Sequence, residues 1–302
     1  MKYYCGWDGG GSKTHVCVTD EAGQIIAEKA FGPLNLNGTS EDTVAQTIRN
    51  CVDFMLSLPY GIEDCQGLVI GVAGISNPHS AEYIEAQVRQ KGYNGILRLM
   101  GDNEIALAGA VSGHGAILIA GTGSVCLLRD KYNNIHRCGG YGHLIDDEGS
   151  GYAIGRDILI AVTQAFDGRA RETCLTEAVY KHLGISSHSE LVAWVYSPER
   201  DKKDIAALAP LLIPAIEDGD KSAVLIEMKA SAFLSHLVTS TFKKAELEAG
   251  ELALMGSIFE HYHTIRQGVT DIIKRELPNV NLVTPRHTPA QGAALLAIEI
   301  FS

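Results

Sequence analysis

A run of three glycines between two strand-like segments is the first feature that could bind a ligand. It reads Asp8, Gly9, Gly10, Gly11, Ser12, Lys13, Thr14. Glycines in such a turn let backbone N–H groups approach a phosphate closely, and Asp8 could hold Mg²⁺ directly or through water. The spacing of a P-loop is absent. Because Asp-Gly is also a common hairpin signal, phosphate binding and a plain turn both remain open for this run alone.

A second turn of the same kind follows the strand-like residues 116–120. It consists of Gly121, Thr122, Gly123 and Ser124. A hairpin would explain this run too, since short Gly/Thr/Ser runs are common. Two such turns in one chain, however, could grip a triphosphate from two sides. The pairing of the two turns therefore favours phosphate binding.

Asp102 is the candidate catalytic residue. It follows the strand-like residues 96–100 and precedes a predicted helix that starts at Glu104. A carboxylate at the carboxyl end of a strand, beside a ligand crevice, could take the proton of a sugar hydroxyl as a general base. The alternative is that Asp102 or Asn103 caps the helix. The two roles are compatible.

Residues 139–152 (GGYGHLIDDEGSGY) form the densest cluster of polar groups and glycines. Asp147 and Glu148 offer acceptors for sugar hydroxyls, and His143 a donor. The alternative is an acidic loop that caps a helix beginning at Tyr152. No second histidine lies at ligand spacing, which argues against a zinc site.

Two weaker signals complete the set. Asn35 and Asn37 lie in a loop, residues 32–38, where amides suit sugar hydroxyls but are also ordinary turn residues. Gly256 and Ser257 follow a short apolar strand and could approach an adenosine, although a strand-end turn explains them equally well.

The elements that must position these residues indicate an α/β chain. Strands are predicted at residues 3–7, 14–19, 24–30, 67–74 and 96–100, with helices at about 40–58 and 80–91. Strand, glycine turn, strand, polar turn and strand then recur over residues 116–138. Helices are predicted at 152–166, 171–183, 187–196, 204–216, 221–249 and 289–301, and strands at 252–256 and 281–284. The recurrence suggests two domains, residues 1–114 and 115–302, with the closing helix able to return to the first.

Charge, apolar runs and cysteine spacing argue against three classes of protein: nucleic-acid-binding, membrane and disulfide-rich proteins. The formal net charge of −11 would repel a nucleic-acid backbone, so nucleic acid is not an expected partner. The N-terminal residues meet Asp8 before a signal-peptide core could form, and no apolar run is long enough to span a membrane, so we expect a cytoplasmic protein that does not bind a membrane. The seven cysteines are dispersed, with no Cys-x-x-Cys pair, and do not indicate a disulfide framework.

Taken in order, these motifs resemble the N-acetylglucosamine kinase group of the BadF/BadG/BcrA/BcrD ATPase family, within the actin, Hsp70 and hexokinase superfamily. The strings GWDGGGSKT, GPLNLNG, MGDNEIALAGA, IAGTGSV, GGYGHLIDDEGSGY and PAQGAALLA carry the resemblance over essentially the whole chain. It implies two ribonuclease-H-like lobes with an ATP and sugar cleft between them. It also implies Mg²⁺, a sugar and ATP as small-molecule partners, a role in carbohydrate metabolism or cell-wall recycling, and leaves a homodimer open.

The resemblance also implies roles for individual residues. Asp102 matches the base that deprotonates the sugar's 6-hydroxyl, whereas Asp8–Thr14 match the first phosphate loop and Gly121–Ser124 the second. Thr14 and Thr122 match phosphate contacts, and Gly256 and Ser257 an adenosine contact. The positions that match those around the amino sugar are Asn35, Asp102, Ser124, Val125, Gly140, Tyr141, Gly142 and Asp147.

Two departures from the family pattern concern the substrate. Tyr141 stands where Trp is usual, and Asp146 where Gly is usual. Related kinases accept N-acetylglucosamine, glucosamine or N-acetylmuramic acid, and the motifs do not separate these sugars. Two rival functions stay open. One is an ATPase that activates a 2-hydroxyacyl-CoA dehydratase through an iron–sulfur cluster, for which Cys138 and Cys174 are conceivable ligands. The other is a sugar sensor without catalysis.

Overall fold

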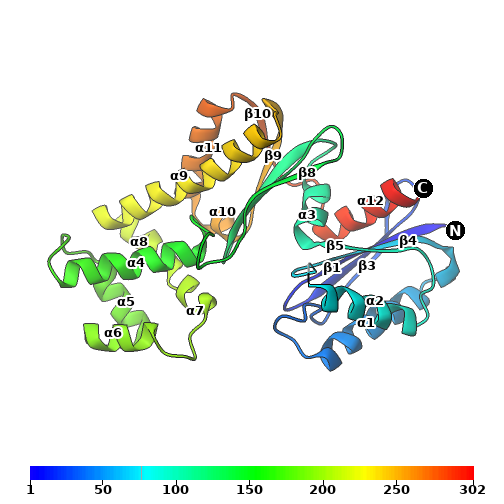
Figure 1. Cartoon of the computed structure of the whole chain (residues 1–302), viewed down its shortest axis with the longest axis horizontal. Helices are drawn as coiled ribbons and strands as arrows, with labels where there is room; N and C mark the ends of the chain where they lie inside the picture. Colours follow the sequence, from blue (N-terminus) through cyan, green and yellow to red (C-terminus); the bar gives the residue numbers. More distant parts are fainter. Residues whose placement is uncertain (76) are drawn as a thin grey trace. The chain divides into compact units, whose positions relative to one another are not determined.

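The computed structural model describes residues 1–75 and 77–302, which form two compact units. The first unit consists of Met1–Gly113 together with Thr284–Ser302, and the second of His114–Val283 (Figure 1). The chain therefore leaves the first unit, builds the second, and returns to the first with its last residues.

The sheet of the first unit positions both candidate carboxylates. Its five strands are β1 (Tyr3–Gly9), β2 (Thr14–Thr19), β3 (Ile25–Phe31), β4 (Cys65–Val72) and β5 (Leu97–Gly101), in the order β3-β2-β1-β4-β5. Strands β1, β2 and β3 are antiparallel neighbours, whereas β1, β4 and β5 run parallel. The carboxyl ends of these three parallel strands consequently lie at one edge of the sheet.

Helices cover both faces of this sheet. Helices α1 (Glu41–Leu56) and α2 (Pro78–Gln90) pack on one face, while α3 (Asp102–Ala110) and α12 (Pro289–Phe301) pack on the other (Figure 1). Gly6 explains the close approach of α12, because a Cβ there would lie 2.2 Å from the backbone nitrogen of Ala294. A side chain at residue 6 would push α12 off the sheet.

The second unit repeats the topology of the first. Its strands are β6 (Gly115–Ala120), β7 (Ser124–Arg129), β8 (Ile135–Gly139), β9 (Ala249–Met255) and β10 (Asn279–Val283), in the order β10-β9-β6-β7-β8. As in the first sheet, three antiparallel strands are followed by two that join in parallel. This is the strand order of a ribonuclease-H-like sheet, and the predicted α/β fold class is confirmed.

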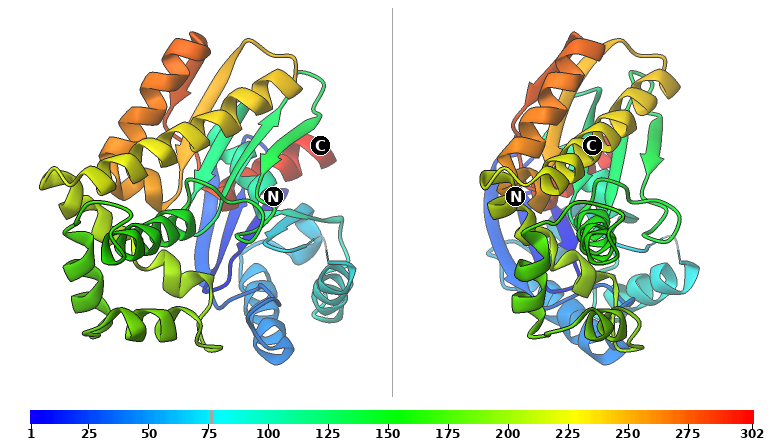
Figure 2. Two further views of the ribbon diagram at one scale, coloured as in Figure 1. Left: turned by 60° about the vertical axis from the view of Figure 1, so that its left-hand side comes forward. Right: turned by 90° about the vertical axis from the view of Figure 1, so that its left-hand side faces the viewer.

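The helices of the second unit enclose its own core. They are α4 (Gly151–Phe166), α5 (Leu175–Leu183), α6 (His188–Val195), α7 (Lys202–Ala206), α8 (Leu212–Glu217), α9 (Lys221–Lys244), α10 (Ser257–His261) and α11 (His263–Glu276). Helices α9 and α11 lie side by side (Figure 2). Leu234 and Val238 of α9, with Ile265 and Val269 of α11, are fully buried in this core. The burial of such side chains is the main source of its stability.

Two of the predicted elements differ in the structure. The single helix predicted over 204–216 is divided into α7, a 3₁₀ turn at Ala209–Leu211 and α8. Pro210 lies inside that turn and has no N–H to donate, so a continuous helix is disfavoured there. The long helix predicted to reach residue 249 ends at Lys244, and β9 begins at Ala249. Among the helices in the described ranges, none has the length and apolarity needed to cross a membrane.

Candidate functional site

The two candidate carboxylates of the first unit lie close to each other. Asp8 is the penultimate residue of β1, and Asp102 directly follows β5. Strand β4 lies between them, with Gly71 opposite both Asp8 and Met100. Burial raises the pKa of Asp8, the charge of Asp102 raises it further, and His15 and Lys13 partly oppose this rise. The topology has thus brought two mutually repelling carboxylates to one edge of the sheet.

This pair suits a magnesium ion. Mg²⁺ is commonly held by one or two carboxylates together with water and substrate phosphates, and a divalent cation would relieve the repulsion that Asp8 experiences from Asp102. Within residues 1–75 and 77–302, no three or more His, Cys, Asp or Glu side chains gather as a metal site. The donor set therefore fits a partly hydrated ion better than a site made entirely of protein ligands.

Asp102 begins α3 but is not its N-cap residue, which is Gly101. Glu104 performs a capping role instead, since its Oε1 accepts a hydrogen bond from the Gly101 N–H at 3.1 Å. Asp102 is half-buried, and its Oδ1 accepts from the N–H of Asn103 at 2.9 Å. The start of a helix also favours a negative charge at this position. The alternative in which Asp102 caps the helix is therefore wrong, whereas Glu104 does contribute to the cap.

The first glycine turn joins β1 to β2 as predicted. Its backbone is closed by a hydrogen bond from the Gly10 N–H to the Lys13 carbonyl at 2.9 Å. Gly11 is exposed, and a Cβ there would have no atom within 4 Å. Thr14 is fully buried, and its hydroxyl donates to the Gly32 carbonyl at 2.8 Å. The structure thus uses the Thr14 side chain to tie this turn to the loop that carries Asn35.

A cavity of about 580 Å³ adjoins this turn. Asp8, Lys13, His15 and Lys29 contribute polar groups to its lining, and Thr288 and Pro289 contribute the beginning of α12. Cationic side chains beside an acid and a glycine turn fit a phosphate that is bound together with a cation.

The two asparagines of the loop at residues 32–38 contribute to its shape. Asn35 Oδ1 accepts from the N–H of Asn37 at 2.9 Å, which is an Asx turn. The Asn37 amide packs against Gly74, where an added Cβ would lie 2.2 Å from Nδ2. The turn-residue alternative is correct for these contacts, while the Nδ2 group of Asn35 carries two donors that a hydroxyl could use.

The second glycine turn joins β6 to β7 and is tied to the beginning of α4. The N–H of Gly151 donates to the Gly121 carbonyl at 2.7 Å, and the N–H of Tyr152 to the Thr122 carbonyl at 3.3 Å. Gly123 faces the carboxylate of Asp147, from which an added Cβ would be 2.9 Å away. The turn and the helix start therefore form one unit of backbone.

The predicted adenosine-contact residues lie next to this turn. Gly256 has a φ of 98°, and a Cβ there would lie 2.4 Å from the carbonyl oxygen of Ala120. The hydroxyl of Ser257 is 3.8 Å from the position of a Cβ on Gly121. Gly121 on one segment of the second unit and Gly256 with Ser257 on another are thereby brought together, as a nucleotide site would require.

The loop between β8 and α4 holds Asp147 in an unusual conformation. Asp147 is buried, with a φ of 62°, in the left-handed region that favours glycine. Its Oδ1 accepts from the N–H of Ser124 at 3.3 Å. The Ser124 hydroxyl donates to the carbonyl of the next residue, Glu148, at 2.8 Å. A left-handed non-glycine residue that is held from two sides is typical of a functional site.

The two departures from the family pattern contact each other. The N–H of Tyr141 donates to Asp146 Oδ2 at 3.0 Å. Arg137 supports the same loop, because its Nε donates to the Gly139 carbonyl at 2.9 Å and its Nη2 to the Gly140 carbonyl. The guanidinium of Arg137 also lies 4.9 Å from the centre of the Tyr141 ring. Sequence reasoning missed Arg137, since a single arginine on a strand gives no signal of a loop contact.

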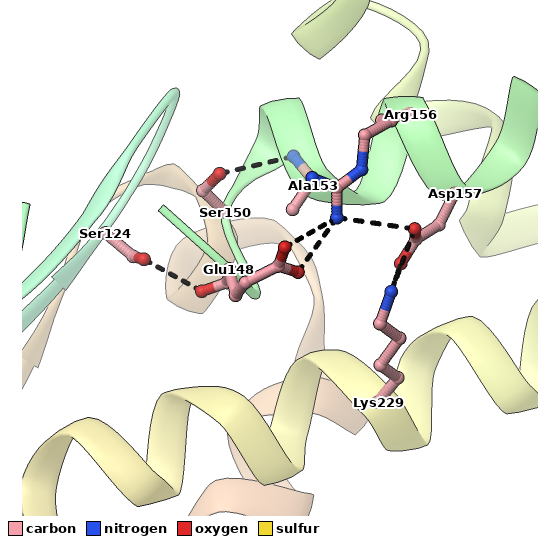
Figure 3. A network of polar contacts seen from close by, with 7 residues as sticks. All are labelled: Ser124, Glu148, Ser150, Ala153, Arg156, Asp157 and Lys229. Carbon is pink, nitrogen blue, oxygen red and sulfur yellow. Dashed lines mark hydrogen bonds and ion pairs between the residues drawn. The ribbon is translucent and has the colours of Figure 1, made fainter. Parts of the chain in front are cut away.

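A network of alternating charges extends from this loop to α9 (Figure 3). Arg156 Nη2 donates to both carboxylate oxygens of Glu148, at 2.7 and 2.9 Å. It also lies 3.6 Å from Asp157 Oδ1, and Lys229 Nζ reaches Asp157 Oδ2 at 2.7 Å. Arg156 was missed as well, because Glu148 lies in the loop before α4 and no helical spacing relates the two residues.

The two cysteines that are conceivable cluster ligands, Cys138 and Cys174, differ in their exposure. All seven cysteines are free thiols; Cys138 is half-buried and Cys174 is exposed. Burial and the charge of Asp220 raise the pKa of the Cys174 thiol.

Comparison with known proteins identifies the family of the chain. The family model described as BadF/BadG/BcrA/BcrD ATPase family matches residues 5–297. The chain is 31% identical to the N-acetylmuramic acid/N-acetylglucosamine kinase of Clostridium acetobutylicum over 98% of each protein. It is 28% identical to the N-acetyl-D-glucosamine kinase of Dictyostelium discoideum, covering 98% of this chain and 97% of that one.

A solved structure of similar fold also covers nearly the whole chain. A protein of Chromobacterium violaceum, provisionally named an N-acetylglucosamine kinase, superposes with a TM-score of 0.77 at 25% identity, covering 98% of this chain and 99% of that one. The match of the family model over nearly the whole chain is sufficient on its own for the assignment. The chain belongs to the BadF/BadG/BcrA/BcrD ATPase family.

Proposed function

We propose that the protein is an ATP-dependent kinase that phosphorylates an amino sugar at its 6-hydroxyl. The observation that carries the proposal is the pair of carboxylates, Asp8 and Asp102, beside a glycine turn at the carboxyl edge of one sheet. The relatives named as N-acetylmuramic acid and N-acetylglucosamine kinases support an amino sugar as the substrate. N-acetylglucosamine is the first candidate, followed by N-acetylmuramic acid and glucosamine.

In the proposed reaction Asp102 accepts the proton of the sugar's 6-hydroxyl. The sugar oxygen forms its bond to the γ-phosphorus of ATP as the bond to the bridging oxygen breaks, and ADP leaves. General-base assistance of this kind contributes roughly 10²–10⁴-fold. Mg²⁺, when bound near Asp8, would neutralise charge on the phosphates. The basic side chains of Lys13 and His15 beside Asp8 support the placement of phosphate there.

The two glycine turns would supply backbone donors. We propose that residues Asp8–Thr14 and Gly121–Ser124 each contact the phosphates of ATP, and that Gly256 and Ser257 contact its adenosine. Preorganised N–H groups stabilise developing negative charge without reorganising at the moment of reaction. The hydrogen bonds that tie the second turn to α4 support this role, because they hold its backbone in a single conformation.

The sugar would be bound by a separate set of groups. Its proposed contacts are Asn35, Asp102, Ser124, Val125, Gly140, Tyr141, Gly142 and Asp147. The burial and left-handed conformation of Asp147 support it as an acceptor for sugar hydroxyls, since a strained residue is retained where its position matters.

A phosphorylation assay tests the proposal. A panel of hexoses, amino sugars and their N-acetyl forms is incubated with ATP and Mg²⁺, ADP release is measured, and the position of the phosphate is read by NMR. We expect ADP and a 6-phosphate with at least one amino sugar. Sugar binding without any ADP would contradict the proposal and favour a sensor.

The base is tested by Asp102→Asn. We expect kcat to fall by roughly 10²–10⁴-fold, because the amide cannot accept the proton, while the Tm and the affinity for ATP stay near those of the wild type. Asp53→Asn, an exposed change on α1, serves as the matched control and should leave kcat unaltered. Turnover at the wild-type rate in Asp102→Asn would remove Asp102 from the mechanism.

A further inference from the structure

The segment from Asp147 to Ser150 must be held against its own conformational preference. Asp147 and Gly149 both have positive φ values, 62° and 77°. A non-glycine residue in this region costs free energy unless its surroundings impose the conformation. The question is therefore which contacts fix the segment, beyond the backbone bonds that join it to the second glycine turn.

The side chain of Glu148 provides an anchor on the opposite side of the segment. Its carbonyl oxygen faces the Ser124 hydroxyl, whereas its carboxylate is directed to Arg156 on α4 (Figure 3). Both carboxylate oxygens lie within hydrogen-bonding distance of the same Nη2. Glu148 therefore accepts hydrogen bonds at two places: its carbonyl from Ser124 of the second glycine turn, and its carboxylate from Arg156 of α4.

Arg156 is itself held in position. The Nη2 group that binds Glu148 also approaches Asp157, and Asp157 is bound by Lys229 of α9 through both oxygens, at 3.0 and 2.7 Å. Asp157 is only 11% exposed and Arg156 only 31%. Four charges of alternating sign, partly screened from water, form a more persistent contact than an isolated surface pair.

We propose that Arg156 is a positioning residue, which fixes Glu148 and thereby holds Asp147 and Ser124 in the geometry that binds the sugar. This inference rests on the proposed function. Arg156 does not need to touch the substrate for this role. Helix α4 has its own anchors, since Ile154, Ile158 and Val162 are buried in the core. Loss of the Arg156 side chain should therefore loosen the segment without unfolding the helix.

The main test compares Arg156→Met with Arg169→Met. Arg169 forms an ion pair with Asp167 at 2.7 Å, near the other end of α4, and makes a matched control because this pair is exposed and separate from the network. For Arg156→Met we expect the KM for N-acetylglucosamine to rise about tenfold and kcat/KM to fall about 10- to 100-fold. Small misplacements of substrate-binding groups lower kcat/KM by about this much. The KM for ATP should change by less than about threefold, because the Gly151–Gly121 hydrogen bond does not involve Glu148.

Two further variants separate positioning from simple loss of charge. Arg156→Lys keeps the charge without the guanidinium and should restore part of the sugar affinity. The double variant Glu148→Gln with Arg156→Met should be no worse than either single change, because both remove the same contact. Equal increases in both KM values together with a lowered Tm would instead mean that Arg156 only stabilises the fold, and the proposal would be overturned.

A measurement without substrate makes the outcome independent of the kinase activity. Hydrogen exchange of the Ser124 and Ser150 amides, which both donate to Asp147, should be about tenfold faster in Arg156→Met and unaltered in Arg169→Met. The Gly151 amide, which donates to Gly121, should keep its wild-type exchange rate in both variants. Exchange of the Ser124 and Ser150 amides as slow as in the wild type would overturn the proposal. If the wild type phosphorylates no amino sugar, the proposed function fails, and these exchange rates alone decide the role of Arg156.

Discussion

Asp8 is a residue whose environment opposes its charge. Its pKa is raised by burial and by the neighbouring Asp102, and Lys13 and His15 only partly offset these effects. A carboxyl group with a raised pKa in the folded state favours folding at low pH, and this contribution is lost as the pH rises through the folded pKa. Ionised Asp8 is therefore expected to cost stability at neutral pH and to be retained for binding a cation.

The variant Asp8→Asn tests this trade-off. At pH 7 we expect a higher Tm than in the wild type without Mg²⁺, because the amide carries no charge to be buried or repelled. The difference should shrink as the pH is lowered through the raised pKa of Asp8, where the wild-type side chain becomes neutral. Kinase activity should fall by about 100-fold or more. A Tm equal to or below that of the wild type at pH 7 would contradict this account.

The motifs of the candidate site that consist of consecutive residues could be predicted from the sequence. The glycine turns, Asp102 and the acidic loop are local patterns, and the structure contains each turn between the strands predicted for it. Arg137 and Arg156 could not be found in this way. Their significance lies in contacts to backbone carbonyls and to Glu148 that depend on the folded loop.

At the scale of elements, N-cap residues explain where two of the predicted helices begin. Ser40 accepts a hydrogen bond from the Thr43 N–H at the start of α1, and Ser150 accepts one from the Ala153 N–H at the start of α4. The boundary at Lys244 was missed because residues 245–249 continue a helix-favouring composition. Glu246 there has a φ of 53°, which ends the helix and which composition does not predict.

The first glycine turn allows ligand binding to be separated from folding. Gly11→Ala adds a methyl group where no atom lies within 4 Å, and Gly11 does not need a positive φ. We expect a Tm within about 1 °C of the wild type, since surface changes are usually near neutral. If phosphates approach this backbone as proposed, the KM for ATP should rise about tenfold.

Gly38→Ala is the matched control for that variant. Gly38 also has nothing within 4 Å and belongs to the neighbouring loop. Its substitution should leave the KM for ATP unaltered. An unchanged KM for ATP in Gly11→Ala would indicate that the first turn is a plain hairpin, the alternative that the run of glycines left open.

At the scale of the whole molecule, the two sheets have corresponding strand orders, β3-β2-β1-β4-β5 and β8-β7-β6-β9-β10. The sequence indicated this correspondence only for the first three strands of each sheet. The parallel strands β9 and β10 are separated from β8 by the helices α4 to α9, so their relation to β4 and β5 was not visible in the order of motifs.

The first unit depends on the last residues of the chain. Helix α12 buries Ala293, Ala294 and Ala297 against the sheet and α3, and Phe301 packs over Gly67. A chain ending at Val283 should therefore lose the protection of β1 and β4 in hydrogen exchange, while His114–Val283 keeps its own core. Deletion of the exposed Ser302 alone is the control and should alter neither unit. Undisturbed protection of β1 in the shortened chain would contradict the prediction.

This return of the chain also sets an order for events on the ribosome. The second unit is continuous in sequence and can fold as soon as its own residues have emerged. The strand that carries Asp8 is made before the second unit but must wait for α12, which is made after it, before its sheet is covered on both faces. A nascent or prematurely terminated polypeptide consequently cannot assemble Asp8 and Asp102 on a finished scaffold. This pair of carboxylates therefore gains its complete scaffold only after synthesis has passed the residues of α12.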